Sequence, residues 1–354
     1  MTAAYPGPSN VFIKDHNASG KMVVDYARNV KDFPVNGYAQ IVPVDKVAGY
    51  YLEMTVEEAG RIVNANLDNF VWYDGEPAPE GAEGTESFEW KPFSCVRRAF
   101  PFKMGNLTVE NASWDIISQH SSIKARQAMT ARTQLAVTAL TTSGNYGTGH
   151  VRDVTSSNTT TGVPGNSGTW ALSTTARQDI KRSLITGAEQ IADATLDVVK
   201  MEDLRLILSS NLAGKISMCQ EIVDHIKGSP MALAQVKGEL SAANRNARYD
   251  LPERLYGIET FVESTRKVTS RKGATRAVSS IFPTDYACLT ARVGSLEGVA
   301  GAPSFSTLVI FAYEEMTVET KNDSDNRRSI GRVVENIVAK MVAPASGILF
   351  TNCQ

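Results

Sequence analysis

The side chains best suited to chemistry, the histidines and the cysteines, are scattered along the 354 residues of the chain. A zinc site needs cysteine or histidine ligands at close spacing, and a nucleophile needs a histidine beside it. Neither spacing occurs in the sequence, which has no C-x-x-C and no H-E-x-x-H. The wide spacing of the cysteines favours free thiols in a reducing compartment. These residues are His16, His120, His150, His225, Cys95, Cys219, Cys288 and Cys353.

Glycine and carboxylate motifs do not indicate catalysis either. The sequence contains no G-x-G-x-x-G, no phosphate-binding loop and no G-x-S-x-G. Glu314 and Glu315 are adjacent acids, but neighbours on a strand point to opposite faces and cannot easily share one site. We therefore predict no catalytic residue, no metal and no cofactor, and a protein that is not an enzyme. An α/β enzyme with a site assembled from scattered residues stays open as an alternative.

The composition predicts a folded chain without a membrane span. Hydrophobic residues make up 42% and charged residues 21%, which is typical of a chain with a sizeable core. A formal net charge of −2 argues against a dedicated nucleic-acid binder, which usually carries a basic excess. The sequence shows no N-terminal export signal and no apolar run of about 18 residues, so we expect no membrane partner.

The first third of the chain suggests extensions without a core of their own. Prolines interrupt residues 1–45, which predicts an extended arm. Residues 74–81 form an acidic Gly/Pro segment, and aromatic and basic side chains follow it up to Phe102. This pattern indicates a long β-hairpin. Because an isolated hairpin is marginal in water, we expect it to lie on another surface, although a sheet edge within the same domain is an equally good interpretation.

The residues expected at an interface between subunits are aromatic or basic. They come from this hairpin and from a basic loop at residues 269–276. For the basic pairs, solvated faces or salt bridges between subunits are favoured over nucleic-acid grooves. The predicted interface residues are Tyr73, Trp90, Phe93, Arg97, Arg98, Phe102, Lys103, Arg271 and Lys272.

Helical spacing of apolar residues predicts a long helix over residues 110–140, although Arg132 falls on the apolar stripe. The Gly/Ser/Thr/Asn-rich residues 141–175 indicate a surface loop or linker. A second helix is expected at 175–195, with Thr174 or Thr175 as its cap.

A buried strand at residues 204–208 precedes a helix through Lys227, capped by Ser209, Ser210 or Asn211. Further strands are expected at residues 258–268, 281–292 and 305–319. From Ile330 to Met341 the spacing fits a helix, but Val and Ile dominate the segment, so we favour a strand.

In this order of elements, ending in Pro344-Ala345-Ser346-Gly347-Ile348-Leu349, the chain resembles the major capsid proteins of tailed bacteriophages, the Hong Kong 97-type shell fold. The resemblance implies an α+β fold in five parts. These are an N-terminal arm (1–48), an extended loop (49–108), a peripheral domain with a long spine helix (109–200), an axial domain (201–302) and closing strands of the peripheral domain (303–354).

What the resemblance implies is a subunit that assembles with copies of itself into hexamers and pentamers of an icosahedral head in the virion. The head would enclose double-stranded DNA without reading its sequence, and the chain would be made in the cytoplasm of the bacterial host. Scaffold, portal and decoration proteins are the further partners implied. One subgroup cross-links neighbours, and Lys91 or Lys103 with Asn352 could be imagined in that role, but we do not predict it. An encapsulin-like compartment shell, which shares the fold, is the main alternative.

Overall fold

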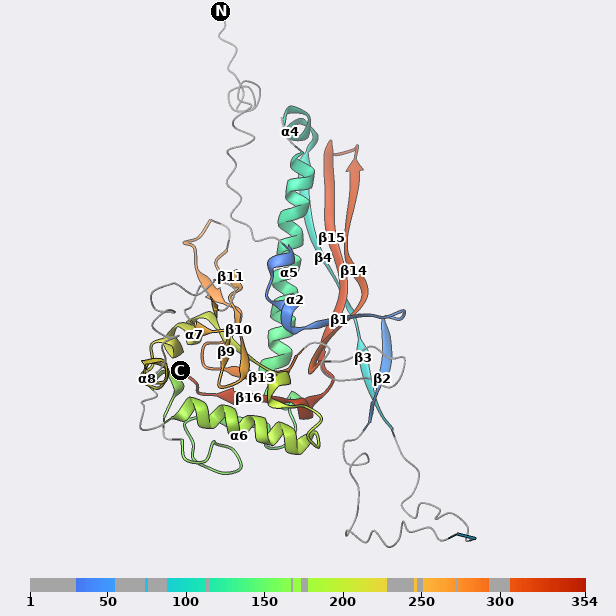
Figure 1. Ribbon diagram of the computed structural model, residues 1–354. Helices are drawn as coiled ribbons and strands as arrows, with labels where there is room; N and C mark the ends of the chain where they lie inside the picture. Colours follow the sequence, from blue (N-terminus) through green and yellow to red (C-terminus); the bar gives the residue numbers. More distant parts are fainter. Residues whose placement is uncertain are drawn as a thin grey trace, which may run out of the picture.

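The structure, a computed structural model, describes most of the chain. The described residues are 30–54, 74–75, 88–112, 115–166, 168–172, 178–227, 245–246, 251–271, 273–292 and 306–354. Most of the predicted arm, and the interface candidates Tyr73 and Lys272, therefore lie outside the described residues. Within the described part, no helix is both long and apolar enough to span a bilayer. Figure 1 shows two sheets joined by one long helix, α5.

The long helix lies along a four-stranded sheet. The strand order is β1 (Gln40–Pro43), β14 (Leu308–Asp323), β15 (Arg328–Met341) and β4 (Val96–Gly105). α5 (Ile116–Thr141) packs on β15, β4 and β14. It begins later than predicted, because Asp115 caps it by accepting a hydrogen bond from Ser118 N and a separate short helix, α4 (Asn106–Asn111), precedes it.

The segment from Ile330 to Met341 is a strand, as predicted. It pairs with β14 on one side and with β4 on the other. Consecutive residues from Val333 to Ile337 are all buried, so both faces of this strand are covered. A strand covered on both faces carries no alternating pattern, which explains why its apolar spacing resembled that of a helix.

The predicted long hairpin is divided between two sheets. β2 (Ala48–Met54) pairs with β3 (Phe88–Ser94) in a two-stranded ribbon, whereas the next strand, β4, joins the four-stranded sheet as its edge. The chain changes sheet at Cys95, whose N–H donates to Val47 O at 2.7 Å. Each of the two interpretations of this segment therefore applies to one half of it, since β3 belongs to the projecting ribbon and β4 is a sheet edge.

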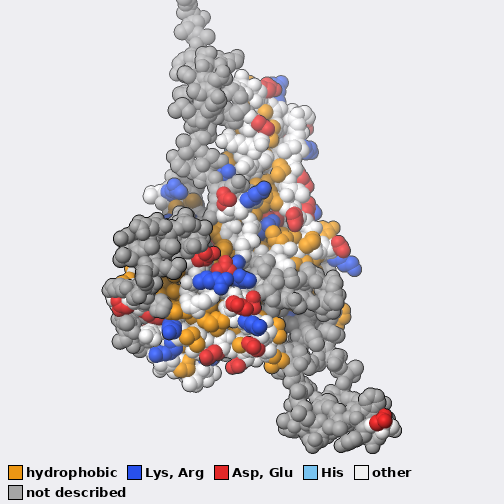
Figure 2. Space-filling model, viewed as in Figure 1, with side chains coloured by type: hydrophobic (Ala, Val, Ile, Leu, Met, Phe, Trp, Pro, Cys, Tyr) orange, Lys and Arg blue, Asp and Glu red, His pale blue; other side chains and the backbone are white. Residues whose placement is uncertain are grey.

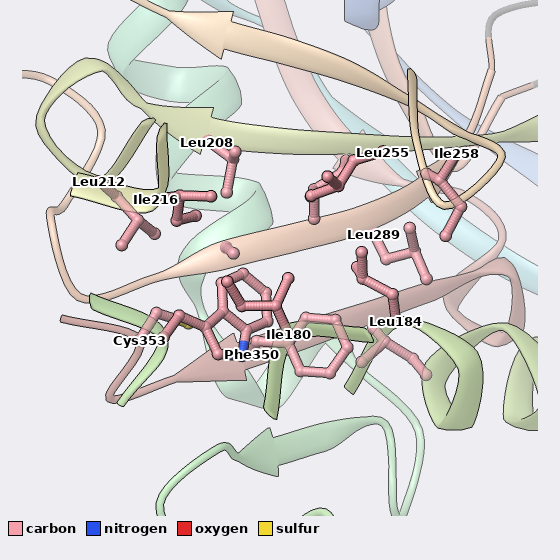
Figure 3. Packing of buried hydrophobic residues seen from close by; sticks show 14 of the residues in the cluster. Ile180, Leu184, Leu208, Leu212, Ile216, Leu255, Ile258, Leu289, Phe350 and Cys353 are labelled. Carbon is pink, nitrogen blue, oxygen red and sulfur yellow. The ribbon is translucent and has the colours of Figure 1, made fainter. Parts of the chain in front are cut away.

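A six-stranded sheet forms the other half of the body. Its order is β5 (Val151–Asp153), β16 (Gly347–Thr351), β13 (Ala287–Ala291), β6 (Leu204–Ser209), β10 (Ile258–Glu263) and β9 (Arg254–Leu255). One face packs against α6 (Asp179–Ala194) and α7 (Ser210–Ser217), as Figure 3 shows for Leu184, Leu208 and Leu212. Because side chains alternate along a strand, Ile207, between Leu206 and Leu208, faces the opposite way, toward α5.

The two sheets share one hydrophobic core through the C-terminal half of α5. Met129 and Leu140 on α5 pack in one cluster with Ile207 of the six-stranded sheet and with Ile310 and Ile337 of the four-stranded sheet. The packing also places α6 and β16 on the same sheet as β6 and β13. The sequence grouped these two elements with the long helix instead, in the segments 109–200 and 303–354.

Three local predictions need correction. Residues 141–175 are not a simple surface linker, because Val154, Val163 and Trp170 are fully buried. Polar residues fold this segment, since the buried Asn166 Nδ2 donates to Val154 O at 3.1 Å and to Ser183 Oγ at 2.8 Å. The polar composition of this segment therefore gave no indication in the sequence that the loop packs into the core.

The second correction concerns the start of α6, whose N-cap is Gln178 in a left-handed conformation, not Thr174 or Thr175. The N–H groups of the first turn, which have no acceptor within the helix, donate instead to the Glu221 carboxylate, from Ile180 N at 3.1 Å and Lys181 N at 2.9 Å. A carboxylate there is favoured by the helix dipole.

The third correction is a break in the helix expected through Lys227. Ser209 caps its start, accepting from Leu212 N at 3.1 Å as predicted, but α7 ends at Ser217 and α8 (Gln220–Lys227) follows. The remaining described elements are short. They are η1 (Val30–Asp32), α2 (Val35–Tyr38), η4 (Ser143–Asn145), η5 (Trp170–Leu172), η6 (Met201–Asp203), β7 (Arg245–Asn246), β8 (Leu251–Pro252), β11 (Arg266–Val268), β12 (Val278–Ser280) and η8 (Pro344–Ser346).

Candidate subunit interface

The β2–β3 ribbon presents two large aromatic side chains to solvent. Tyr50 is 66% exposed and Trp90 is 64% exposed. Their rings meet edge to face with centroids 6.4 Å apart. A groove of about 670 Å³ runs beside them between the ribbon and β1, and Pro43, Val44 and Tyr51 contribute to its lining. Exposed aromatic surface of this kind is typical of a contact site. Trp90 is among the interface residues expected from the sequence, whereas Tyr50 is not.

The predicted interface residue Phe93 lies inside the subunit. Its ring is 9% exposed and stacks on Phe311 of β14 at 4.6 Å, and Tyr51 stacks on the same Phe311 at 5.7 Å. These rings fasten the base of the ribbon to the four-stranded sheet. Phe93 therefore supports the ribbon and offers little surface to a neighbour.

Phe102 is likewise an internal residue. It is 7% exposed, and its ring stacks on His120 of α5 at 6.2 Å. On β15, Gly331 is paired with Phe102, and the absence of a side chain at Gly331 makes room for the ring. The aromatic side chains of this segment therefore differ in role. Trp90 is exposed, whereas Phe93 and Phe102 pack inside the subunit, and only their burial distinguishes them.

The basic candidates on β4 are exposed to different degrees. Arg97 is mostly exposed and pairs with Glu314 at 3.1 Å within the subunit. Arg98 is partly covered, and its Nη1 donates to Val96 O and Ile337 O, each at 3.2 Å. Lys103 is exposed. A charge that already has an intramolecular partner contributes less to an interface than an unpaired charge does. Of these three residues, Lys103 is therefore the most available for a contact with another subunit.

A hairpin of β11 and β12 carries the remaining candidate, Arg271. Its side chain is exposed, as are those of Arg266 and Arg276, which are not among the predicted interface residues. The register pairs Val268 with Val278. Arg276 belongs to the basic loop at residues 269–276 that the sequence indicated.

The described residues include no group of three or more histidine, cysteine or acidic side chains placed to hold a metal ion. The four cysteines are buried and are not joined in disulfides. Burial raises the pKa of Cys95, Cys219 and Cys353, and it raises the pKa of Cys288 to about 12. A thiol that stays protonated is a poor nucleophile. In the view of Figure 2, basic and acidic side chains are interspersed over the described surface, so this face has no broad basic groove.

No family model matches the sequence, and no curated protein is significantly similar to it. Solved structures, in contrast, match along almost the whole chain. A phage-related protein from Bordetella bronchiseptica has a TM-score of 0.57 at 15% identity, with 89% of this chain and 90% of that chain covered. The capsid protein of the cyanophage P-SCSP1u has a TM-score of 0.51 at 10% identity, covering 97% of this chain and 93% of that one.

The chain has the phage capsid fold. The capsid protein of an empty GTA particle is similar as well, with a TM-score of 0.50 at 11% identity and coverage of 96% and 99%. In each case most of both chains is covered, so the likeness is one of the fold as a whole. The α+β fold class expected from the order of elements is thereby confirmed. In this capsid fold, the exposed aromatic and basic surfaces described above are candidates for contacts between copies.

Proposed function

We propose that this chain is the structural subunit of a bacteriophage head. The observation that carries the proposal is the likeness to the P-SCSP1u capsid protein, which spans nearly all of both chains. The β2–β3 ribbon with its exposed Tyr50 and Trp90 also supports the proposal, because such a projection can contact a neighbouring copy in a shell.

The arrangement of elements supports a stiff, plate-like building block. α5 is 26 residues long, about 39 Å at 1.5 Å per residue, and the paired strands β14 and β15 run alongside it. The shared core between the sheets ties this long part to the six-stranded sheet. In the proposed shell, the six-stranded part corresponds to the axial domain at the centre of each capsomer, and the long part to the peripheral domain.

The proposal extends to partners. Copies of the chain form hexamers and pentamers of an icosahedral head, which encloses double-stranded DNA without sequence-specific contacts, after synthesis in the host cytoplasm. Scaffold, portal and decoration proteins complete the particle. Among the predicted residues, we assign Trp90, Lys103 and Arg271 to contacts between subunits, whereas Phe93 and Phe102 act within one subunit.

Electron microscopy of the purified chain, with light scattering on the same sample, tests the proposal. We expect closed shells, tubes or ring-shaped capsomers, alone or with a crowding agent. A matched control is the fully buried Leu206 changed to Asp, which should abolish soluble protein because it buries an unpaired charge. A uniform monomer that resists assembly under all these conditions would contradict the proposal.

The contents of the shells separate a phage head from an encapsulin-like compartment. DNA in particles made during infection supports the head. An enzyme that co-purifies inside the shells, without DNA, would support the compartment instead.

A further inference from the structure

Two strands of the four-stranded sheet have an unpaired backbone edge, on opposite sides of β15. Among the described residues, β4 pairs with β15 alone. β1 pairs with β14 only from Val309 to Ala312, so residues 313–323 of β14 also pair with β15 alone. Figure 1 shows β14 and β4 on the two sides of β15, with β1 confined to the lower part of β14. Along this length the sheet therefore has a free edge on each side.

The register shows which backbone groups lie on the free edge of β4. In an antiparallel pair, every second residue directs its N–H and C=O to the partner strand, and the residues between direct theirs away. Asn106, next in register after β4, donates its N–H to Arg327 O at 2.9 Å. The even-numbered residues of β4 are therefore bonded to β15, and Ala99 and Lys103 direct their backbone groups outward. Both are exposed, and so is Pro101, whose missing N–H is tolerated at such an outward position.

The same alternation identifies the free edge of β14. Since the odd-numbered residues of β15 are bonded to β4, its even-numbered residues face β14. Their partners from Thr317 to Asp323 are odd-numbered, so Val318, Thr320 and Asn322 direct their N–H and C=O groups away from β15. All three residues are exposed, and the apolar Val318 is 52% exposed. Each free edge is thus a row of backbone donors and acceptors that a further strand can pair with.

The side chains of the two edge strands carry opposite net charge. β4 contains three basic residues and no acid, whereas residues 313–323 of β14 contain four acids and one lysine. Several of these charges pair within the subunit, as Arg97 does with Glu314 at 3.1 Å. Lys103 and Glu315, in contrast, are exposed and belong to no ion pair among the described residues. Like charges opposite each other destabilise a pair of strands, so β4 beside β4 and β14 beside β14 are disfavoured.

We propose that the free edge of β4 in one subunit pairs with the free edge of β14 in a neighbouring copy, which joins the two sheets into one. The proposal rests on the proposed function, and it names a surface through which the subunits associate. Two different edges meet in this contact, so it is of the head-to-tail kind that can close into a ring. Main-chain hydrogen bonds supply affinity when a strand is added to a sheet, and the opposite charges select the partner edge.

Disulfide trapping between two kinds of subunit tests the pairing directly. The four native thiols are buried, so a cysteine introduced on an exposed edge reacts first. Ala99→Cys subunits are mixed with subunits that carry one cysteine at a position from 317 to 321, each position in turn, and the mixtures are assembled and oxidised. We expect a disulfide-linked dimer for at least one position, because paired strands bring Cα atoms to about 5 Å.

Two controls show whether the trapped dimer is specific. Ala99→Cys subunits alone should give no dimer, because β4 does not pair with itself in the proposed contact. A mixture of Ala99→Cys with Ser122→Cys should give none either, because Ser122 is exposed on α5 and not on a sheet edge.

Proline at the outward positions provides a second test. Ala99→Pro and Thr320→Pro each remove one N–H from a free edge, and neither N–H is bonded to β15, so the pairing within the subunit is kept. Shell yield, measured by sedimentation and electron microscopy, is expected to fall about tenfold or more in each variant. Ala99→Ser and Thr320→Ser are the matched controls, which keep the N–H and should assemble normally. Thermal unfolding of the unassembled subunits checks that the proline variants fold, and if one does not, the trapping experiment decides alone.

Several results would overturn the pairing while leaving the proposed function intact. These are shells that trap no dimer at any of the positions, proline variants that fold and assemble as well as their serine controls, and a dimer from Ala99→Cys alone, which would show that β4 pairs with itself. If the wild type forms no shells, the proposed function fails. The same mixtures are then oxidised at high subunit concentration, where absence of a dimer overturns the pairing separately.

Discussion

At the scale of single residues, a buried ion pair joins the long helix to the four-stranded sheet. Arg132 Nη2 donates to Glu335 Oε2 at 3.1 Å and Nε donates to Oε1 at 3.5 Å, with both side chains almost fully buried. Burial raises the pKa of Glu335 above its ordinary value, and Arg132 opposes that rise. The cost of removing both charges from water is therefore only partly offset by their attraction.

Breaking this pair should be far more harmful than replacing it. Arg132→Met is expected to lower the free energy of unfolding of the subunit by about 3–5 kcal/mol, because it leaves a buried carboxylate without its partner. Arg132→Met combined with Glu335→Leu should be nearly neutral. Urea denaturation of the unassembled subunit measures both, and an equal loss in the single and double variants would show that the pair is not the cause.

The direction of the pKa shift adds a pH dependence to the same experiment. An acid whose pKa is raised on folding stabilises the native state at low pH, and that contribution is lost as the pH rises through the raised pKa. The deficit of Arg132→Met should therefore shrink as the pH is lowered and Glu335 becomes protonated. A deficit that does not change with pH would contradict this explanation.

The buried thiols make a second prediction at this scale. All four cysteines have raised pKa values because of burial, and Cys288 Sγ also donates to Leu140 O at 3.6 Å. We expect a thiol reagent at about pH 8 to modify the native subunit no faster than it unfolds, and to modify all four thiols at once in denaturant. A thiol that reacts rapidly in the native subunit would show that its site opens locally.

At the scale of elements, close contact between β15 and β4 depends on a glycine. A side-chain carbon added at Gly331 would lie 2.1 Å from the end of the Phe102 ring, a distance at which atoms overlap. The ring cannot easily turn aside because it also stacks on His120. β4, an edge strand, therefore has its position on the sheet set in part by this pair.

Gly331→Ala is expected to destabilise the subunit by about 1–3 kcal/mol through overpacking. Replacing the ring by a smaller side chain as well, with Phe102→Leu, should recover part of the lost stability. Gly214→Ala in α7 is the matched control, since nothing lies within 4 Å of its added carbon and alanine favours helix over glycine by up to about 1 kcal/mol. Thermal unfolding compares the three, and a neutral Gly331→Ala would mean that the strands separate to accept the methyl group.

At the scale of the whole molecule, the segment that leads from residues 1–29 into β1 is held by the six-stranded sheet. Tyr38 OH donates to the buried Glu263 Oε2 at 2.9 Å, and the Tyr38 ring meets Phe261 edge to face at 5.6 Å. The Arg205 guanidinium donates to Gly37 O. Because β1 then pairs with β14, the segment ties both sheets together.

Tyr38→Phe removes one donor from the buried Glu263 carboxylate and should cost about 1–3 kcal/mol of stability. We expect hydrogen exchange to become faster in α2 and the residues next to it, with less change in α6. Tyr313→Phe serves as control, since that side chain is 42% exposed. Unchanged exchange in α2 would indicate that packing alone holds the segment.

Local patterns along the chain were enough to predict the order of elements, the strand from Ile330 to Met341, the Ser209 cap and the α+β class. They follow from side-chain periodicity and from residue preferences, which act over a few neighbours. Even the position of Arg132 on the apolar stripe was visible. Its partner Glu335 was not, because the two are separated by most of the chain.

Tertiary structure alone decided which aromatic side chains are free. Phe93, Phe102 and Trp90 have the same character in the sequence, yet long-range pairing of β3 and β4 with distant strands buries the first two and leaves Trp90 exposed. Likewise, packing placed α6 and β16 on the six-stranded sheet. Burial depends on which faces distant segments cover, and that information is distributed over the whole chain and not held in any one segment.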